Sequence, residues 1–264
     1  MKLNMMTLGR FGCVKSACGS LAGLIMAWVI FGQSLVHAEG QGAASMAQPG
    51  REQGTGDLFN LWHFDGQQVG EAPAGFSART VGDDASGTWK IEADPTAPSA
   101  PNVVVQAVPC PSGCFQMLLA EGFSYDYPDL AIRLRVTSPG SKRVGGAVFG
   151  VKDSRNFYAV VVDLATDTLE VIRVLNGKET VLGRASVKPW KEAWHLLRVQ
   201  RNTILNKEFI ETIFDNQLAV SVQDKALGAG QIGLVTRGEA AISFDNFHAI
   251  PLYSQQLLSP PAAY

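Results

Sequence analysis

The sequence predicts an all-β fold, a two-sheet antiparallel β-sandwich of the jelly-roll type. Short runs of alternating or β-branched residues recur at intervals of about 8–12 residues, which predicts about 12–14 strands. Turn-forming residues separate these runs, and no amphipathic stretch of convincing helical length appears. The missing helical period excludes a doubly wound α/β fold, and the missing internal repeat argues against a propeller.

The N-terminal segment has the pattern of a secretory signal peptide, residues 1–38. It contains three basic residues, no acidic residue and an apolar run at Leu21–Phe31. Small residues at Val36 and Ala38 suit cleavage after Ala38. An uncleaved single-pass anchor is the alternative, although the run is shorter than the roughly 20 residues that span a bilayer.

Composition bounds the partners and the compartment. The chain has 264 residues, a net charge of -2 and 17% charged residues, which excludes a strongly basic nucleic-acid binder, a mainly disordered chain and a multi-span membrane protein. The segment before Glu39 carries three basic residues, so its removal would leave a net charge of -5. We expect an exported protein, periplasmic or extracellular, with no nucleic-acid partner and no stable membrane insertion after cleavage.

One domain follows the signal peptide. Residues 39–56 are small, polar and Gly-rich, which predicts a disordered leader. Residues 57–252 contain no second linker and are expected to form the jelly-roll domain, and residues 253–264 are expected to form a flexible tail.

Two strand patterns occur in this domain. Apolar and polar residues alternate in Leu130–Val136, as in a strand with one buried face, whereas Phe157–Val162 is apolar throughout and favours burial on both faces. Asn176-Gly177 and Asp215-Asn216 predict tight hairpin turns. Further strands are expected at 169–174, 194–199, 209–214, 218–222, 231–236 and 241–250.

Cys110 and Cys114 are the cysteines that remain after removal of the signal peptide. In an oxidising compartment the pair predicts a disulfide that closes a tight loop. A redox or zinc site is less favoured, because the spacing is not CxxC and no histidine lies nearby.

Catalytic patterns are missing from the sequence. There is no Gly-x-Ser-x-Gly motif, and His195 lies within a predicted strand, where a framework role is favoured over that of a base. Glycosidases need two carboxyl groups about 5 Å or about 6.5–9.5 Å apart, and no run of alternate carboxylates supplies them. We assign no catalytic residue and favour a binding protein over an enzyme.

A sugar-binding surface needs aromatic platforms bordered by polar groups. The candidate platforms Tyr125, Tyr127 and Trp190 lie near predicted loops, and Arg133 and Arg135 share one face of a strand. A solvated outer strand face is the alternative for these arginines. Asp163 is a further candidate for ligand binding, with turn formation as its alternative.

No cofactor is expected, with a structural Ca²⁺ ion as the candidate exception. Asp65 follows the first strand and Asp245 lies within the last. Terminal strands of sandwiches often pair, which would bring these oxygen ligands together, but two residues do not complete a calcium shell. Turn capping is the alternative for both residues.

Four segments occur in a characteristic order, at 94–103, 152–160, 194–199 and 244–247. Together they resemble the concanavalin A-like, laminin-G-type jelly rolls of exported bacterial proteins. The resemblance covers about Leu58 to Pro251 and is closest to the 3-keto-disaccharide hydrolase-like family, often labelled glycoside hydrolase family 16-like. It implies a two-sheet sandwich with carbohydrate as the usual ligand class.

The same resemblance bears on the site residues. Members of this group place arginines at positions that match Gly150 and Val161, and the carboxylate motif of true family 16 glycoside hydrolases is missing. We therefore expect a non-catalytic carbohydrate-recognition or envelope-associated protein. The alternatives are a hydrolase or lyase acting on 3-keto-disaccharides or glycosides, and a protein-interaction scaffold.

Overall fold

The computed structural model describes residues 59–82, 88–108, 114–136, 143–188, 193–238 and 241–252. All of these residues belong to one compact unit of the chain, Gln48–Tyr264. The predicted signal peptide, the leader and the tail from residue 253 onward lie outside the described residues.

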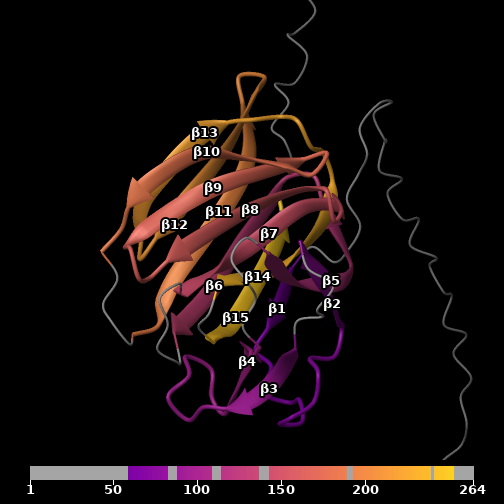
Figure 1. Cartoon of the computed structure of the whole chain (residues 1–264), viewed down its shortest axis with the longest axis vertical. Coiled ribbons are helices and arrows are strands. Elements are labelled where there is room, and N and C mark those ends of the chain that lie inside the picture. The colour runs from indigo at the N-terminus through magenta and orange to yellow at the C-terminus, as the bar shows by residue number, and fades with distance from the viewer. Residues whose placement is uncertain are drawn as a thin grey trace, which may run out of the picture. The chain divides into compact units, whose positions relative to one another are not determined.

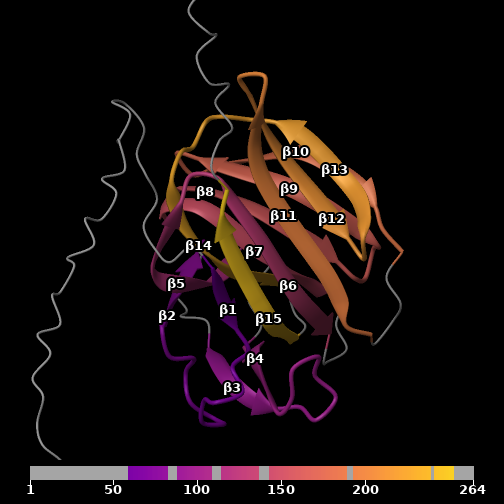
Figure 2. The same ribbon diagram turned by 180° about the vertical axis from the view of Figure 1, so that it is seen from behind.

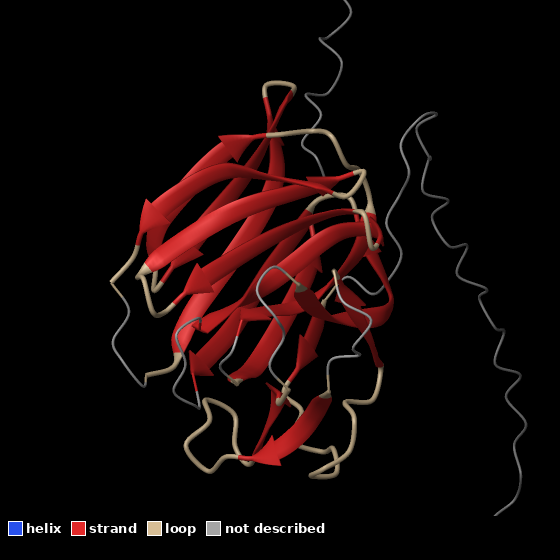
Figure 3. Ribbon diagram, in the orientation of Figure 1, coloured by secondary structure: helices blue, strands red, loops and turns tan. Residues whose placement is uncertain are grey.

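Fifteen strands and no helix occur in the described ranges, which confirms the all-β prediction (Figure 3). No helix within these ranges could cross a membrane. The strands are β1 Asn60–Trp62, β2 Phe76–Val81, β3 Trp89–Ala93, β4 Asn102–Gln106, β5 Phe115–Tyr125, β6 Pro128–Val136, β7 Arg143–Asp153, β8 Asn156–Asp163, β9 Thr168–Leu175, β10 Lys178–Ser186, β11 His195–Ile204, β12 Lys207–Phe214, β13 Gln217–Gln223, β14 Gly230–Gly238 and β15 Ile242–Pro251.

The strands form two antiparallel sheets, which Figures 1 and 2 show from opposite sides. The eight-stranded sheet has the order β13-β12-β11-β6-β15-β4-β3, with β1 paired to β15. The seven-stranded sheet has the order β10-β9-β8-β7-β14-β5-β2. The chain crosses between the sheets several times, so each sheet contains strands that are distant in sequence.

The core between the sheets follows from the predicted alternation. In β6, Leu130, Ile132 and Leu134 are buried and face the other sheet, while the residues between them point outward. Strand β8 contributes Tyr158 and Val160 to the same core. Burial of these apolar side chains supplies the main stabilisation of a sandwich.

Three two-residue hairpin turns have positive φ at both central positions, as type I′ turns require. The structure confirms the predicted turns Asn176-Gly177 and Asp215-Asn216. The third turn, Leu205-Asn206, joins β11 to β12 and was missed from the sequence because leucine is not a turn residue.

The outer face of the seven-stranded sheet is apolar and buried, and we call its side chains the outer apolar cluster. Phe157, Ala159 and Val161 of β8 point to this face, while their neighbours point to the core between the sheets. The prediction that this strand is buried on both faces is therefore confirmed. The cluster comprises Phe115, Met117, Leu119, Val148, Val151, Phe157, Ala159, Val161, Ile172, Val174 and Val235.

Candidate functional site

The outer face of the eight-stranded sheet is polar, in contrast to that of the seven-stranded sheet. Arg133 and Arg135 project from it because they alternate with the buried leucines and isoleucine of β6. Neighbouring strand β11 adds Arg198, and Trp194 lies one residue before that strand. We call Arg133, Arg135, Arg198, Asp129 and Trp194 the arginine face.

A bidentate ion pair fixes one side of this face. The Nε and Nη2 atoms of Arg198 donate to the two carboxylate oxygens of Asp129, at 2.8 and 2.5 Å. Gln200 Nε2 donates to the same carboxylate at 2.9 Å. Hydrogen bonding to Asp129 raises the pKa of Arg198 further above its usual value. This guanidinium is therefore held in place as a permanent charge.

The other side of the face is fixed by Asp94, in the loop between β3 and β4. Arg135 forms an ion pair with Asp94 and donates to Thr96 Oγ1 at 2.9 Å. Burial alone would raise the pKa of Asp94, but hydrogen bonds from Thr96 and the charge of Arg135 outweigh it and lower that pKa. The Arg135 guanidinium also lies over the Trp194 ring, 4.7 Å from its centroid.

Arg133 lies between these two fixed groups. Its Cα is paired with Leu196 of β11 on one side and with Asp245 of β15 on the other. Its half-buried side chain forms no hydrogen bond or ion pair with any described residue. The indole nitrogen of Trp194 is buried and has no hydrogen-bond partner in the described ranges. The arginine face thus retains the Arg133 guanidinium as a donor for a ligand.

His248 of β15 borders the arginine face, since its Cα is paired with Ala131 of β6. Burial lowers the pKa of His248, which the Asp129 charge partly opposes and the Arg198 charge reinforces. Its imidazole is therefore neutral at pH 7, and its Nε2 has no hydrogen-bond partner among the residues described. The Phe59 ring lies 4.7 Å from the imidazole, centroid to centroid.

The predicted calcium ligands come together through pairing of the terminal strands. Strand β1 pairs with β15, so Asp65, just after β1, reaches the same loop as Asp245. Ser99 links them, because its N–H donates to Asp245 Oδ2 at 2.7 Å and its hydroxyl to Asp65 Oδ2 at 2.5 Å. Burial raises the pKa of Asp245, and the nearby Asp65 charge adds to that rise.

These contacts determine which ligands the site at Asp65 and Asp245 offers to a cation. No group of three or more His, Cys, Asp or Glu side chains in the described residues is placed to hold a metal ion. Asp65 and Asp245 would therefore need amide or backbone oxygens to complete a shell. Calcium binding stays a prediction. The hydrogen bonds from Ser99 show that both carboxylates anchor the loop between β3 and β4.

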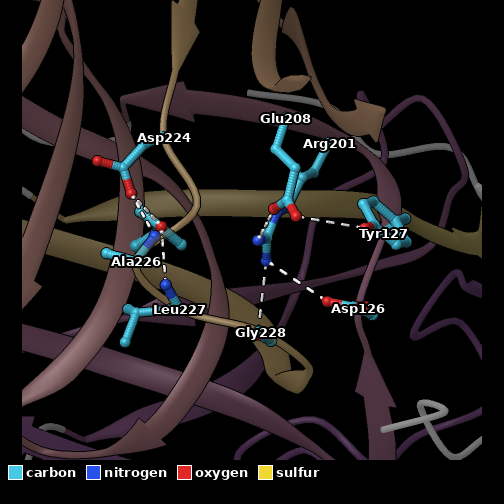
Figure 4. Close-up of polar contacts among 9 residues, drawn as sticks. Asp126, Tyr127, Arg201, Glu208, Asp224, Ala226, Leu227 and Gly228 are labelled. Carbon is cyan, nitrogen blue, oxygen red and sulfur yellow. Dashed lines mark hydrogen bonds and ion pairs between the residues drawn. The ribbon is translucent and has the colours of Figure 1, made fainter. Parts of the chain in front are cut away.

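A second polar group, the Arg201 cluster, lies between the two sheets (Figure 4). Arg201 of β11 is 1% exposed and points inward, where its Nη2 pairs with Glu208 at 2.5 Å and its Nη1 lies 3.8 Å from Asp126. The rings of Tyr127 and Tyr158 lie 5.6 and 5.7 Å from its guanidinium carbon. Arg201 therefore joins β12 to the loop between β5 and β6.

The cluster continues into the loop between β13 and β14. The Tyr158 hydroxyl bonds to Asp224, which also pairs with Arg173 of β9, and it accepts from the N–H of Leu227 at 3.1 Å. Burial raises the pKa of Tyr158, and the hydrogen bond to Asp224 adds to the rise. These bonds tie both sheets to one loop, which indicates a structural role.

The predicted aromatic platforms take other positions. Tyr125 and Tyr127 are 2% and 6% exposed, so their rings offer little surface for stacking. The Tyr125 hydroxyl accepts from Asn60 at 2.9 Å, and Tyr127 packs on the Arg201 cluster. Trp190 lies outside the described residues. Trp194 is the aromatic residue beside the arginines, and its position in the strand-forming run 194–199 was its sequence signal.

The remaining predicted residues do not join the arginine face. Asp163 lies at the end of β8, in the other sheet, and accepts from the N–H of Ala165 at 2.8 Å, which matches the turn alternative. His195 is buried, with its Nδ1 2.8 Å from Asp215, as a framework residue. Cys114 is buried before β5, but Cys110 lies outside the described residues, so the disulfide stays a prediction.

Gly150 and Val161, the two positions singled out by the resemblance, take different places in the seven-stranded sheet. Val161 belongs to the outer apolar cluster and is buried. Gly150 has a φ of 60° at an irregularity in the β7–β8 pairing. A Cβ at Gly150 would meet the Tyr158 ring of the core between the sheets, so the two positions do not share the outer face of the seven-stranded sheet. The arginine face belongs to the opposite sheet.

No protein-family profile and no curated protein matches the sequence. Solved structures of similar fold include the following two. The carbohydrate binding module CBM66 from Bacillus subtilis is 18% identical with a TM-score of 0.51, over 67% of this chain and 95% of that one. The Emp47p carbohydrate recognition domain is 12% identical with a TM-score of 0.54, over 76% and 98%. These similarities confirm a concanavalin A-like sandwich.

Proposed function

We propose that this chain is an exported carbohydrate-recognition protein that binds glycans on the arginine face. The observation that carries the proposal is the placement of Arg133, which makes no described polar contact, between two immobilised arginines, Arg135 and Arg198. Arg133 supplies hydrogen-bond donors for sugar hydroxyls, and the half-buried indole ring of Trp194, which packs on Arg135, adds apolar surface for a sugar face.

Immobilisation of the neighbouring arginines favours binding. Asp94 and Asp129 hold Arg135 and Arg198 in single orientations, so a ligand would not have to order these long side chains. The fold is consistent with this use, because solved structures of similar fold include a carbohydrate binding module and a carbohydrate recognition domain. The charged residues further favour sugars with polar or acidic substituents.

Titration with soluble polysaccharides and a glycan array tests the proposal, with and without Ca²⁺. We expect Arg133→Ala to weaken binding of any identified glycan by about tenfold or more. Arg184→Ala is the matched control, because Arg184 is an exposed arginine on β10 of the other sheet, and it should leave affinity unchanged. Absence of binding to every glycan in both conditions would contradict the proposal.

Export is part of the same proposal and has its own test. The signal pattern in residues 1–38 predicts that the protein leaves the cytoplasm and begins at Glu39. N-terminal sequencing of the protein recovered from the periplasm or medium should find that residue. Recovery of the intact N-terminus from the membrane fraction would favour the uncleaved anchor.

Hydrolysis of 3-keto-disaccharides is the second candidate, within the hydrolase-like family that the sequence resembles. Its favouring observation is that two of the four segments of the resemblance meet, since Ser99 bonds to Asp245 and Asp65. Asp245 has a raised pKa and Asp65 is its acidic neighbour, a pattern that acid–base pairs use. Incubation with 3-keto-glycosides should release product that Asp65→Asn abolishes and Asp163→Ala does not.

A further inference from the structure

The β11–β12 hairpin ends in an exposed apolar tip, and this feature is independent of the arginine face. Ile204 and Lys207 form the last backbone pair, and Leu205 and Asn206 form the turn. Leu205 is 79% exposed and Ile204 is 49% exposed, so two consecutive aliphatic side chains are exposed to solvent. Figures 1 and 2 show this hairpin projecting beyond the neighbouring strands.

Folding gives no reason for leucine at this turn. The φ angles of Leu205 and Asn206 are 49° and 63°, in the left-handed region that costs a leucine conformational energy. The two other turns of this type begin with Asn176 and Asp215, residues that tolerate such φ angles. Leu205 therefore combines backbone strain with exposure of an apolar side chain, and both favour a role in binding.

The charge around the tip is positive. Lys207 and Lys225 are exposed, and the N–H of Asp224 donates to the carbonyl of Glu208 at 3.2 Å, which brings the two lysine-bearing segments together. The neighbouring acids are neutralised, because Glu208 pairs with Arg201 and Asp224 pairs with Arg173. The local surface thus presents two aliphatic side chains flanked by two lysines.

We propose that this tip docks the protein on an anionic lipid surface, with Ile204 and Leu205 in the interfacial region and Lys207 and Lys225 against the headgroups. Apolar side chains bordered by cations bind such interfaces by burial and by attraction to anionic lipid. A projecting tip suits a deformable bilayer surface, and contact at two side chains is reversible. The docking is peripheral and adds to glycan recognition.

The base of the hairpin is rigid. Beneath the tip, the buried Arg201 of β11 pairs with the half-buried Glu208 of β12, and Arg201 also bonds to the carbonyl of Gly228 at 3.5 Å. The tip is therefore held in one position relative to the sandwich before it meets a surface. Docking therefore costs little conformational entropy in the hairpin, so even two inserted side chains contribute to the affinity for the membrane.

Vesicle co-sedimentation of the full chain tests the proposal, using phosphatidylcholine vesicles with and without phosphatidylglycerol. We expect the anionic vesicles to bind more tightly, and Leu205→Asn to weaken that binding by about tenfold. Leu218→Asn is the matched control, because Leu218 is 64% exposed on β13 and lies outside the tip, and it should leave binding unchanged. The double change Lys207→Gln and Lys225→Gln should remove the preference for anionic lipid.

Hydrogen exchange reports on the tip itself. Vesicle binding through residues 1–38, which all variants share, would not slow exchange at the tip. Anionic vesicles should slow exchange in the segment 203–208 of the wild-type chain but not of Leu205→Asn. The proposal is overturned if the wild type binds neither vesicle, if it binds both equally, or if Leu205→Asn binds as the wild type does. Protection elsewhere without protection of 203–208 would also overturn it.

Discussion

Replacement of Arg201 by methionine would remove a buried cation of the Arg201 cluster while keeping much of its volume. Loss of one partner from a buried ion pair costs about 3–5 kcal/mol, because the other charge is left uncompensated. The side chains of Glu208 and Asp126 remain 20% and 21% exposed, so water recovers part of the loss. We therefore expect the free energy of unfolding to fall by about 3 kcal/mol, the lower end of that range.

Urea unfolding of the wild type and of Arg201→Met measures this change. Arg184→Met is the control, because the Arg184 side chain is 64% exposed, whereas that of Arg201 is 2% exposed, and exposed pairs contribute about 0–1 kcal/mol. A loss below about 1 kcal/mol would refute the structural role of Arg201.

Three further predictions concern other parts of the sandwich. Leu205→Asn should raise the melting temperature, because asparagine tolerates the φ of 49° better than leucine, and calorimetry that shows a lower value would contradict the strain. Phe157→Ala should cost about 3–5 kcal/mol in urea unfolding, because Phe157 is fully buried in the outer apolar cluster, whereas a loss below about 1 kcal/mol would indicate an open face. Asp245 has a raised pKa in the folded state, so the folded protein binds the Asp245 proton more tightly than the unfolded chain does. The stability that this proton contributes is lost as the pH rises from the pKa of the unfolded state through that of the folded state. Asp245→Asn should remove this pH dependence in denaturant melts at a series of pH values, and an unchanged slope would exclude Asp245 as its source.

Local sequence patterns were sufficient to predict much of the fold. The alternation in Leu130–Val136 gave the correct inward and outward faces of β6, and the apolar run of β8 indicated burial on both sides. Asn176-Gly177 and Asp215-Asn216 predicted two turns because their side chains suit positive φ. Each of these features depends on a few consecutive residues, so tertiary contacts were not needed to recognise it.

The candidate site was harder to predict because its contacts join distant segments. Arg135 meets Asp94 and Trp194 only after three elements are packed together. Tyr127 was expected to be an open platform, but it is buried because the distant Arg201 attracts its ring. Nothing in the local sequence distinguishes an aromatic loop residue that faces solvent from one that covers a buried cation.

The outer apolar cluster has a consequence for how the protein exchanges protons with water. Strand β8 is shielded on both faces and paired on both edges, so solvent reaches its amide groups only when the whole fold opens. The eight-stranded sheet has a wet outer face, and its amides can exchange through smaller openings. The slowest-exchanging amides should therefore lie in the seven-stranded sheet. The eight-stranded sheet, which carries the arginine face, remains free to adjust to a ligand.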